Sequence, residues 1–465
     1  MEMVLDIFTT ISGLGKTIMI PLMITLIGLV VRCPFSKALK GGITVGIGLI
    51  GIDLVMGLVY TYISPVANLL VSQFGLNLSN IDIGWASVSG LAFSTTVGSF
   101  IIPFILIVNI IMLSIGATKT INIDIWNYWH YALTGSIVFI LTKNLLFGFT
   151  AATMHCIIAL VTADRTAEKV QKVMHLPGVS IPQGFAVAEV PVAILVEKVF
   201  NLFHKDEKTE NVEKNVSYIS NNRFLKTLAD PIYIGMIIGT LLSLFVGNNL
   251  QESLVVGISM SALMFLLPRM VKVLMEGLVP ISNATKSYMT KKYKGQQFYI
   301  GMDSAVLLGH PTTLAVGLLL IPIALILAMI LPGNTIVPMA GLAGTAYFVA
   351  MPTVLHNGKF PRVLVSGIIV TAISLLVGSA FAPYITEFAM SGALNIPEGA
   401  GGVSSLSAQL YSFLPYLLFK LNDYFGMLAS VVIIIGLSLW NRRFLKNKKD
   451  LGTVEFKDAE TSSYQ

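Results

Sequence analysis

Long apolar runs separated by short polar segments dominate the chain and predict membrane-spanning helices. Extended through their flanks, the runs reach the roughly 20 residues that a helix needs to cross a bilayer. The clearest runs are Ile18–Val31, Ile43–Tyr60, Phe100–Leu113, Ile137–Leu146, Ile232–Val246, Leu314–Leu331, Val363–Val377 and Met427–Leu439. With less regular segments added, the pattern predicts an all-α polytopic membrane protein of roughly ten or eleven transmembrane helices.

Composition supports the same class of protein. Apolar residues make up 55% of the chain and charged residues 12%, whereas soluble domains carry about 25% charged residues. The net charge is +6, but the basic residues form no stripe interleaved with aromatic residues, so we expect no nucleic-acid partner. The two cysteines, Cys33 and Cys156, are not in CxxC spacing, and no disulfide framework, metal site or cofactor is predicted.

Basic residues between the apolar runs predict the orientation of the chain. Such residues favour the cytoplasmic side, which places the N-terminus outside and the C-terminus in the cytoplasm. They are Arg32, Lys37, Lys40, Arg165, Lys169, Lys172, Arg269, Lys272, Arg442, Arg443, Lys446, Lys448 and Lys449. A cleavable signal peptide begins with basic residues, whereas this chain begins with the acidic residues Glu2 and Asp6. The first span is therefore expected to remain in the mature protein.

Two similar tetrapeptides interrupt the apolar pattern. Ile181-Pro182-Gln183-Gly184 returns 215 residues later as Ile396-Pro397-Glu398-Gly399. Proline lacks an amide donor and glycine relaxes the backbone, so each break frees polar groups that hydrocarbon cannot satisfy. Short apolar runs beside such breaks predict re-entrant hairpins. Interrupted segments in two halves of a transporter point to its binding site, and the chain is therefore predicted to be a carrier.

Weaker matches near the same offset predict a duplicated unit. Val45-Gly46-Ile47 corresponds to Val256-Gly257-Ile258, and Gly84 to Gly301. We expect repeats of roughly 40–200 and 252–410, inverted relative to each other, joined by a hydrophilic linker at 201–230. Coincidence in a chain rich in glycine and isoleucine is the alternative. Residues 1–440 form the predicted membrane transport domain, and 441–465 a cytoplasmic tail with too little apolar content for a core.

Polar residues near the interruptions are the candidates for substrate contact. Asp303 is costly in apolar surroundings unless it faces a cavity, although it could instead bind freed amides. His310 precedes a proline and suits either ligand contact or capping. Gln183 and Glu398 suit a neutral polyhydroxylated ligand, because amide and carboxylate groups bind hydroxyls without needing a charged substrate. The alternative is that both satisfy local backbone.

Other polar and aromatic positions receive more local interpretations. The rings of Trp126-Asn127-Tyr128-Trp129-His130 are predicted to anchor the chain at the membrane interface, with Asn127 and His130 as possible substrate contacts. Asp53 and Glu189 are expected to pack between domains. Alternating apolar and charged residues over Arg269–Lys294 predict a helix along the inner interface.

Three strings carry a resemblance to a known family. They are Asn122-Ile123-Asp124-Ile125-Trp126-Asn127-Tyr128-Trp129-His130, Met275-Glu276-Gly277-Leu278-Val279-Pro280-Ile281-Ser282, and Phe298-Tyr299-Ile300-Gly301-Met302-Asp303-Ser304-Ala305 with Gly309-His310-Pro311. Over essentially its whole length the chain resembles the galactitol-type membrane component, enzyme IIC, of the bacterial sugar phosphotransferase system. Related ascorbate-type components imply eleven spans with inverted repeats, a V-shaped domain that forms a homodimer, and a mobile core that carries substrate by an elevator mechanism.

The resemblance implies group translocation across the bacterial cytoplasmic membrane. Galactitol or a similar polyol would enter from outside and receive a phosphoryl group from a separate IIB protein, itself supplied by IIA. Because the donor cysteine resides on IIB, whether this chain counts as an enzyme stays open. Matching by position places the family's polar site on His130, Gln183 and Asp303, with His310 and Glu398 as further members. Asp303 would orient or deprotonate the attacked hydroxyl.

Two other function classes remain open at this point. A proton- or sodium-coupled polyol symporter would use Asp303 as its ion site. An intramembrane enzyme is less well supported, since the chain contains neither an HExxH metal pair nor a GxSxG elbow.

Overall fold

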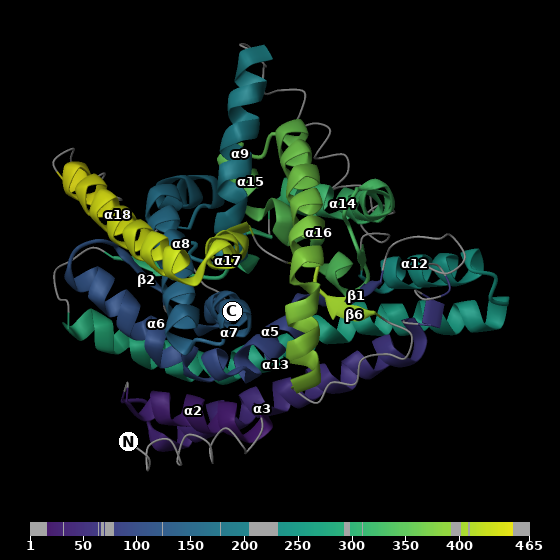
Figure 1. Cartoon of the computed structure of the whole chain (residues 1–465), viewed down its shortest axis with the longest axis horizontal. Coiled ribbons are helices and arrows are strands. Elements are labelled where there is room, and N and C mark those ends of the chain that lie inside the picture. Colours follow the sequence, from purple (N-terminus) through teal and green to yellow (C-terminus); the bar gives the residue numbers. More distant parts are fainter. Residues whose placement is uncertain are drawn as a thin grey trace.

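The computed structural model describes residues 16–30, 32–63, 65–66, 69, 79–122, 124–176, 178–203, 231–292, 298–308, 310–391, 401–407 and 410–449. Four helices pack side by side along the lower and right-hand part of Figure 1. They are α2 (Lys16–Val30), α3 (Phe35–Leu58), α12 (Pro231–Phe245) and α13 (Leu250–Lys292). Glycines allow their backbones to meet: a Cβ on Gly41 would lie 2.5 Å from the Gly277 carbonyl oxygen.

The remaining helices form a second body above this layer. Within this body α9 and α16 stand upright in the view of Figure 1. They are α5 (Gly84–Ser94), α6 (Thr96–Ser114), α7 (Tyr128–Thr142), α8 (Leu145–Met174), α9 (Gly184–Phe203), α14 (Pro311–Ile330), α15 (Ala350–Leu355), α16 (Phe360–Ser391), α17 (Leu410–Leu421) and α18 (Asp423–Lys449). Short 3₁₀ segments lie at Ile125–Asn127, Ser304–Leu307 and Ala340–Val349, and α3 continues into a π-helical turn at Val59–Ile63.

Within the described ranges, five helices are long and apolar enough to cross a membrane. They are Thr96–Ser114, Leu145–Met174, Pro311–Ile330, Phe360–Met390 and Asp423–Asn447. The expectation of a helical polytopic protein is confirmed, and the number of eleven spans stays a prediction.

The second body contains two small parallel sheets, and the apolar pattern predicts neither. The first has the order β5 (Ile336–Val337), β1 (Asn80–Asp82), β6 (Gly402–Ser404), and the second β2 (Thr120–Asn122), β4 (Tyr299–Gly301), β3 (Val179–Ser180). In each sheet the central strand comes from one side of the 201–230 linker and both flanking strands come from the other side. The two halves of the chain are therefore interleaved in the core.

The strands satisfy backbone groups beside the interruptions. The Ile300 amide donates to the Gly178 carbonyl at 2.7 Å, and the Met302 amide to the Ser180 carbonyl at 2.9 Å. Unpaired backbone groups in an apolar interior cost free energy, so pairing between distant breaks stabilises non-helical chain at these points.

The strand order does not support the expected equivalence of the two tetrapeptides. Ile181–Gly184 directly follows β3, whereas Ile396–Gly399 precedes β6 in the chain and lies outside the described residues. Gln183 stands three positions after the end of β3. The residue three positions after the end of β6 is Ser407. A short string can match without occupying the same topological position, and Ser407 is the counterpart of Gln183 by strand position.

Two predicted boundaries also differ from the structure. The tail was expected to begin at residue 441, but α18 continues to Lys449 and Asn441 is fully buried. Its Nδ2 donates to Asp164 Oδ2 at 2.7 Å, which holds the end of α18 against α8. The described part of the predicted interface helix over Arg269–Lys294, residues 269–292, is the second half of one 43-residue helix, α13. Residues 450–465 and most of the linker, 204–230, fall outside the described part.

Candidate functional site

A pocket lies in the second body, at the ends of the two sheets. Five of the six strands are followed within four residues by a residue that lines it, and β5 leads into the 3₁₀ segment that carries Gly344, Tyr347 and Phe348. The lining residues are Trp85, Trp126, Trp129, His130, Gln183, Phe185, Asp303, Ala305, Gly344, Tyr347, Phe348 and Ser407. Parallel strands expose their carboxyl ends to ligands, and this pocket lies at such ends.

Three of the predicted site residues meet in this pocket. His130 is fully buried near the start of α7, Gln183 is 5% exposed before α9, and Asp303 is 6% exposed between β4 and α14. Their convergence from three distant segments gives an otherwise apolar pocket a small set of polar groups, which is the usual composition of a ligand site.

Asp303 combines a structural bond with its place in the pocket wall. Its Oδ1 accepts from the Ala305 amide at 2.7 Å and caps the 3₁₀ segment Ser304–Leu307. Its own amide donates to Asp124 Oδ2 at 3.2 Å. Burial, and then the nearby Asp124 carboxylate, raise the pKa of the Asp303 carboxyl. A carboxyl group whose pKa is raised toward neutrality is suited to accept a proton from a substrate hydroxyl.

Gln183 also has two roles. Its Oε1 accepts from the Ala186 amide at 2.6 Å and caps the start of α9, so the backbone role expected as an alternative is present. The carboxamide nitrogen is the part of the side chain that can donate to a ligand. The preceding Pro182 carbonyl accepts from the Tyr131 hydroxyl at 2.6 Å, which satisfies one of the polar groups freed by the break.

Gly184 brings the break close to two histidines. A Cβ at this position would lie 2.6 Å from the Cβ of His130 and 2.8 Å from Nε2 of His155. Contacts that short do not occur in folded proteins, so only glycine allows α9 to begin beside α7 and α8 here. His155 Nδ1 is hydrogen-bonded to the Thr134 hydroxyl at 2.7 Å, which fixes its ring behind the pocket.

Aromatic rings form most of the pocket wall. The centroid of Trp85 lies 6.3 Å from that of Trp126 in an edge-to-face arrangement and 6.0 Å from that of Tyr347. Trp126 and Trp129 are only 4% and 2% exposed, so the prediction that they anchor the chain at the membrane interface is wrong. The 3₁₀ turn after β2 directs this aromatic segment into the core. Such rings can cover the C–H faces of a polyhydroxylated ligand.

The other predicted site residues lie elsewhere. Asn127 is buried, but its Nδ2 donates to Asn122 Oδ1 at 3.1 Å and the residue does not line the pocket. His310 is half-buried at the start of α14, where its Nδ1 accepts from the Thr312 amide at 3.2 Å. That bond is the capping role expected as its alternative. Glu398 falls outside the described residues.

Of the two carboxylates predicted to pack between domains, only Glu189 has a described side chain. Glu189 is 1% exposed, and its Oε2 accepts from the Met351 amide at 3.0 Å, which joins α9 to α15. This contact is a packing contact within the second body, whereas the prediction was packing between domains. The side chain of Asp53 is outside the described part of the structure.

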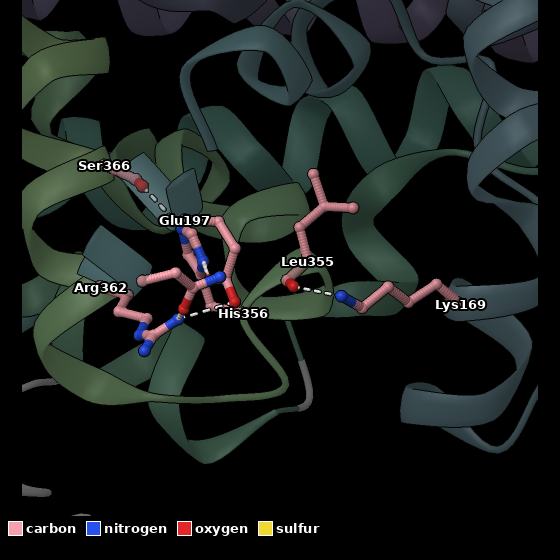
Figure 2. Close-up of polar contacts among 7 residues, drawn as sticks. Lys169, Glu197, Leu355, His356, Arg362 and Ser366 are labelled. Atoms are coloured by element: carbon pink, nitrogen blue, oxygen red, sulfur yellow. Dashed lines mark hydrogen bonds and ion pairs between the residues drawn. The ribbon is translucent and has the colours of Figure 1, made fainter. Parts of the chain in front are cut away.

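A second polar cluster lies further along α9 (Figure 2). Glu197 Oε2 pairs with His356 Nδ1 at 2.6 Å and Oε1 with Arg362 Nη1 at 2.7 Å. His356 Nε2 is 2.9 Å from the Ser366 hydroxyl, and Lys169 donates to the Leu355 carbonyl nearby. Ser366 is fully buried within α16, so its hydroxyl is not open to a substrate as the nucleophile of a Ser-His-Glu triad would have to be. The cluster instead joins α9 to the start of α16.

The described residues contain no group of three or more His, Cys, Asp or Glu side chains able to hold a metal ion. The residues that line the pocket carry aromatic rings, one carboxylate, one carboxamide, one imidazole and two hydroxyl groups, those of Tyr347 and Ser407.

Comparison with known proteins identifies the family. The sequence profile described as "PTS system sugar-specific permease component" matches residues 10–399. This chain belongs to that family. The permease is 40% identical over 401 residues to a "Putative permease IIC component" of Escherichia coli (strain K12), covering 86% of this chain and 90% of that protein. It is 30% identical over 416 residues to the "PTS system galactitol-specific EIIC component" of the same strain, covering 88% and 91%.

Membership confirms the resemblance seen in the sequence. It makes the permease a multi-pass membrane protein of the phosphotransferase system, with a sugar or polyol substrate and partner components of that system. A gradient-coupled symporter is not favoured. Sequence reasoning missed Trp85, Tyr347, Phe348 and Ser407, because aromatic and hydroxyl side chains carry little signal in an apolar chain. The only sequence signal is their place shortly after strands of two or three residues, which are too short to recognise by period.

Proposed function

We propose that the permease carries galactitol or a similar polyol across the cytoplasmic membrane for coupled phosphorylation by a separate IIB protein. The observation that carries the proposal is the convergence of His130, Gln183 and Asp303 within one pocket lined by aromatic rings. Of the described lining residues, none is lysine or arginine. A charged sugar phosphate would be costly to bury without such a partner, whereas a neutral polyol fits these groups.

Each polar side chain has a distinct proposed role. Asp303 accepts a hydrogen bond from the hydroxyl that is to be phosphorylated, and then accepts its proton. The Gln183 carboxamide donates to a second hydroxyl, and the His130 ring orients a third. Asn127 and His310 are proposed to support the local fold rather than touch the ligand. Phosphoryl transfer depends mainly on positioning and charge stabilisation, so orientation of the hydroxyl is the larger part of this contribution.

Phosphorylation also gives transport its direction. The pocket binds the neutral polyol, but the product carries a charged phosphate for which the pocket lining supplies no lysine or arginine. Its return through an apolar barrier is therefore unfavourable. Capture by IIB in the cytoplasm would make uptake unidirectional without ATP hydrolysis by this chain.

The architecture implied by the resemblance is part of the proposal. The interleaved sheets, each with a central strand from one half and flanking strands from the other, support two duplicated halves of inverted topology. We propose that the layer of α2, α3, α12 and α13 forms the V-shaped dimerisation domain, and that the body with the pocket moves against it as an elevator. The N-terminus lies outside and the C-terminus in the cytoplasm.

Reconstituted vesicles provide the direct test. Purified permease is incorporated into vesicles with labelled galactitol outside and phosphorylated IIB with IIA inside, and galactitol phosphate in the lumen is measured. The matched control contains IIB whose phosphoryl-donor cysteine is replaced by serine. We expect luminal product only with active IIB. Gradient-driven accumulation of unmodified galactitol without IIB would establish the symporter instead, and phosphorylation of a different sugar class alone would overturn the substrate assignment.

A further inference from the structure

Asp82 is a buried carboxylate at the end of β1 that the transport mechanism above does not use. It is fully buried, and its two oxygens accept hydrogen bonds from four backbone amides. Oδ1 accepts from Gly84 at 2.9 Å and from Leu406 at 3.1 Å. Oδ2 accepts from Gly341 at 2.8 Å and from Met339 at 3.2 Å. One side chain thus joins three segments that are far apart in the sequence.

Each of these segments leads directly into the pocket wall. Gly84 precedes Trp85, and Leu406 precedes Ser407. Gly341 is the second residue of the 3₁₀ segment that carries Gly344, Tyr347 and Phe348. Asp82 itself does not line the pocket. The fit is close, because a Cβ on Gly341 would lie 2.5 Å from Asp82 Oδ2.

Another part of the pocket wall is held in a similar way. Asp124 Oδ1 accepts from the Trp126 amide at 3.2 Å, and its Oδ2 accepts from the Asp303 amide at 3.2 Å. Trp126 and Asp303 both line the pocket. Each of these two parts of the wall is therefore tied together by one carboxylate that does not itself line the pocket.

We infer that Asp82 is a positioning residue of the substrate pocket, whose carboxylate sets the wall formed by Trp85, Tyr347 and Ser407. The geometry stands on the contacts above, while the effect on polyol affinity rests on the proposed function. Charge matters here because an ionised carboxylate can accept from all four amides. In Asp82→Asn one oxygen becomes an NH₂ group that faces amide donors, so the contacts of that side are lost.

Asp164 provides a matched control. It is also a buried carboxylate, and it accepts from Thr118, Thr120 and Asn441 side chains and from the Lys119 amide. These partners lie at the start of β2 and in α18, and none is next to a pocket-lining residue. Asp164→Asn therefore removes a comparable buried charge without touching either part of the wall.

The test measures galactitol affinity by calorimetry, together with hydrogen exchange of the backbone amides, for wild-type protein and both variants. We expect Asp82→Asn to weaken galactitol binding by about tenfold or more, as the loss of buried hydrogen bonds at a binding site implies. Exchange should rise at Gly84, Met339, Gly341 and Leu406 but not throughout the protein. Asp164→Asn should bind galactitol within about twofold of wild type, since the pocket is intact.

Several results would contradict the inference. Wild-type affinity in Asp82→Asn, or an equal loss in both variants, would overturn the positioning role. If wild-type protein does not bind galactitol, the proposed substrate is wrong. Hydrogen exchange then still tests the positioning role of Asp82, because unchanged or uniformly raised exchange in Asp82→Asn would refute it. Should Asp82→Asn fail to fold, Gly341→Ala tests the same contact, because the added methyl displaces the carboxylate, and unchanged galactitol affinity in that variant would also refute it.

Discussion

Replacement of Asp303 by asparagine separates its chemical role from its structural one. Asp303 Oδ1 caps a 3₁₀ segment by accepting from the Ala305 amide, and an asparagine side-chain oxygen can accept the same bond. Asp303→Asn therefore keeps the cap, the size of the side chain and its place between β4 and α14. It removes the negative charge and the capacity to accept a proton. The variant should insert and fold like the wild-type protein.

The expected magnitudes follow from these changes. A hydrogen bond from a substrate hydroxyl to a carboxylate is worth about 1.5–3 kcal/mol, so galactitol affinity should fall by roughly 10- to 100-fold. Loss of a general base reduces a reaction by about 10²–10⁴-fold, which sets the expected loss in phosphorylation at saturating galactitol. Asp303→Ala should show both losses and an additional destabilisation of about 1 kcal/mol from the missing cap.

Three measurements on each variant decide the matter. Thermal unfolding in detergent reports the cap, calorimetry reports galactitol affinity, and formation of galactitol phosphate in vesicles with phosphorylated IIB reports the reaction. Phosphorylation by Asp303→Asn at the wild-type rate, at equal abundance in the membrane, would remove Asp303 from the reaction. Unfolding of Asp303→Asn at the temperature of Asp303→Ala would instead show that the charge itself is needed for the fold.

Three further predictions address other parts of the protein. Gly184→Ala forces a methyl group to within 2.6 Å of His130, so unfolding should become easier by about 1–3 kcal/mol, and a thermal unfolding curve like that of wild type would refute the close approach. Arg362→Met breaks the ion pair with Glu197, whose side chain is 35% exposed. Because solvent screens this pair, chemical unfolding should show a destabilisation of only about 1–2 kcal/mol, and galactitol affinity should be unchanged. Asp303 acts as a base only when ionised, and its pKa is raised, so phosphorylation should fall as the pH decreases through that raised pKa, a dependence that Asp303→Asn should lack.

The sequence predicted the helices well where apolar residues run without interruption. The run Ile232–Val246 corresponds to α12 (Pro231–Phe245), and Ile43–Tyr60 falls largely within α3 (Phe35–Leu58). A long apolar run has few alternatives to a helix in a membrane, because the backbone must satisfy its own hydrogen bonds there. Length and composition determine this part of the fold.

The polar site residues were found for a related reason. His130, Gln183 and Asp303 stand out because polar side chains are costly in apolar surroundings, and the structure places all three in one pocket. The same argument could not find Trp85 or Tyr347, since an aromatic ring in an apolar segment has no cost to explain. It also misjudged Trp126 and Trp129, whose composition suits a membrane interface and a buried pocket equally well.

The sheets explain why the remaining features escaped prediction. Strands of two or three residues have no period to read, and their pairing depends on contacts between segments such as Asn80–Asp82 and Gly402–Ser404. Each half of the chain supplies the centre of one sheet and the flanks of the other, so backbone groups freed by a break in one half are satisfied largely by the other half. The pocket lies at the ends of these strands and takes its lining from both halves. It follows that neither half alone can complete the wall of aromatic rings around Asp303, and that the breaks which would be costly in isolation become the means by which the two halves build one site.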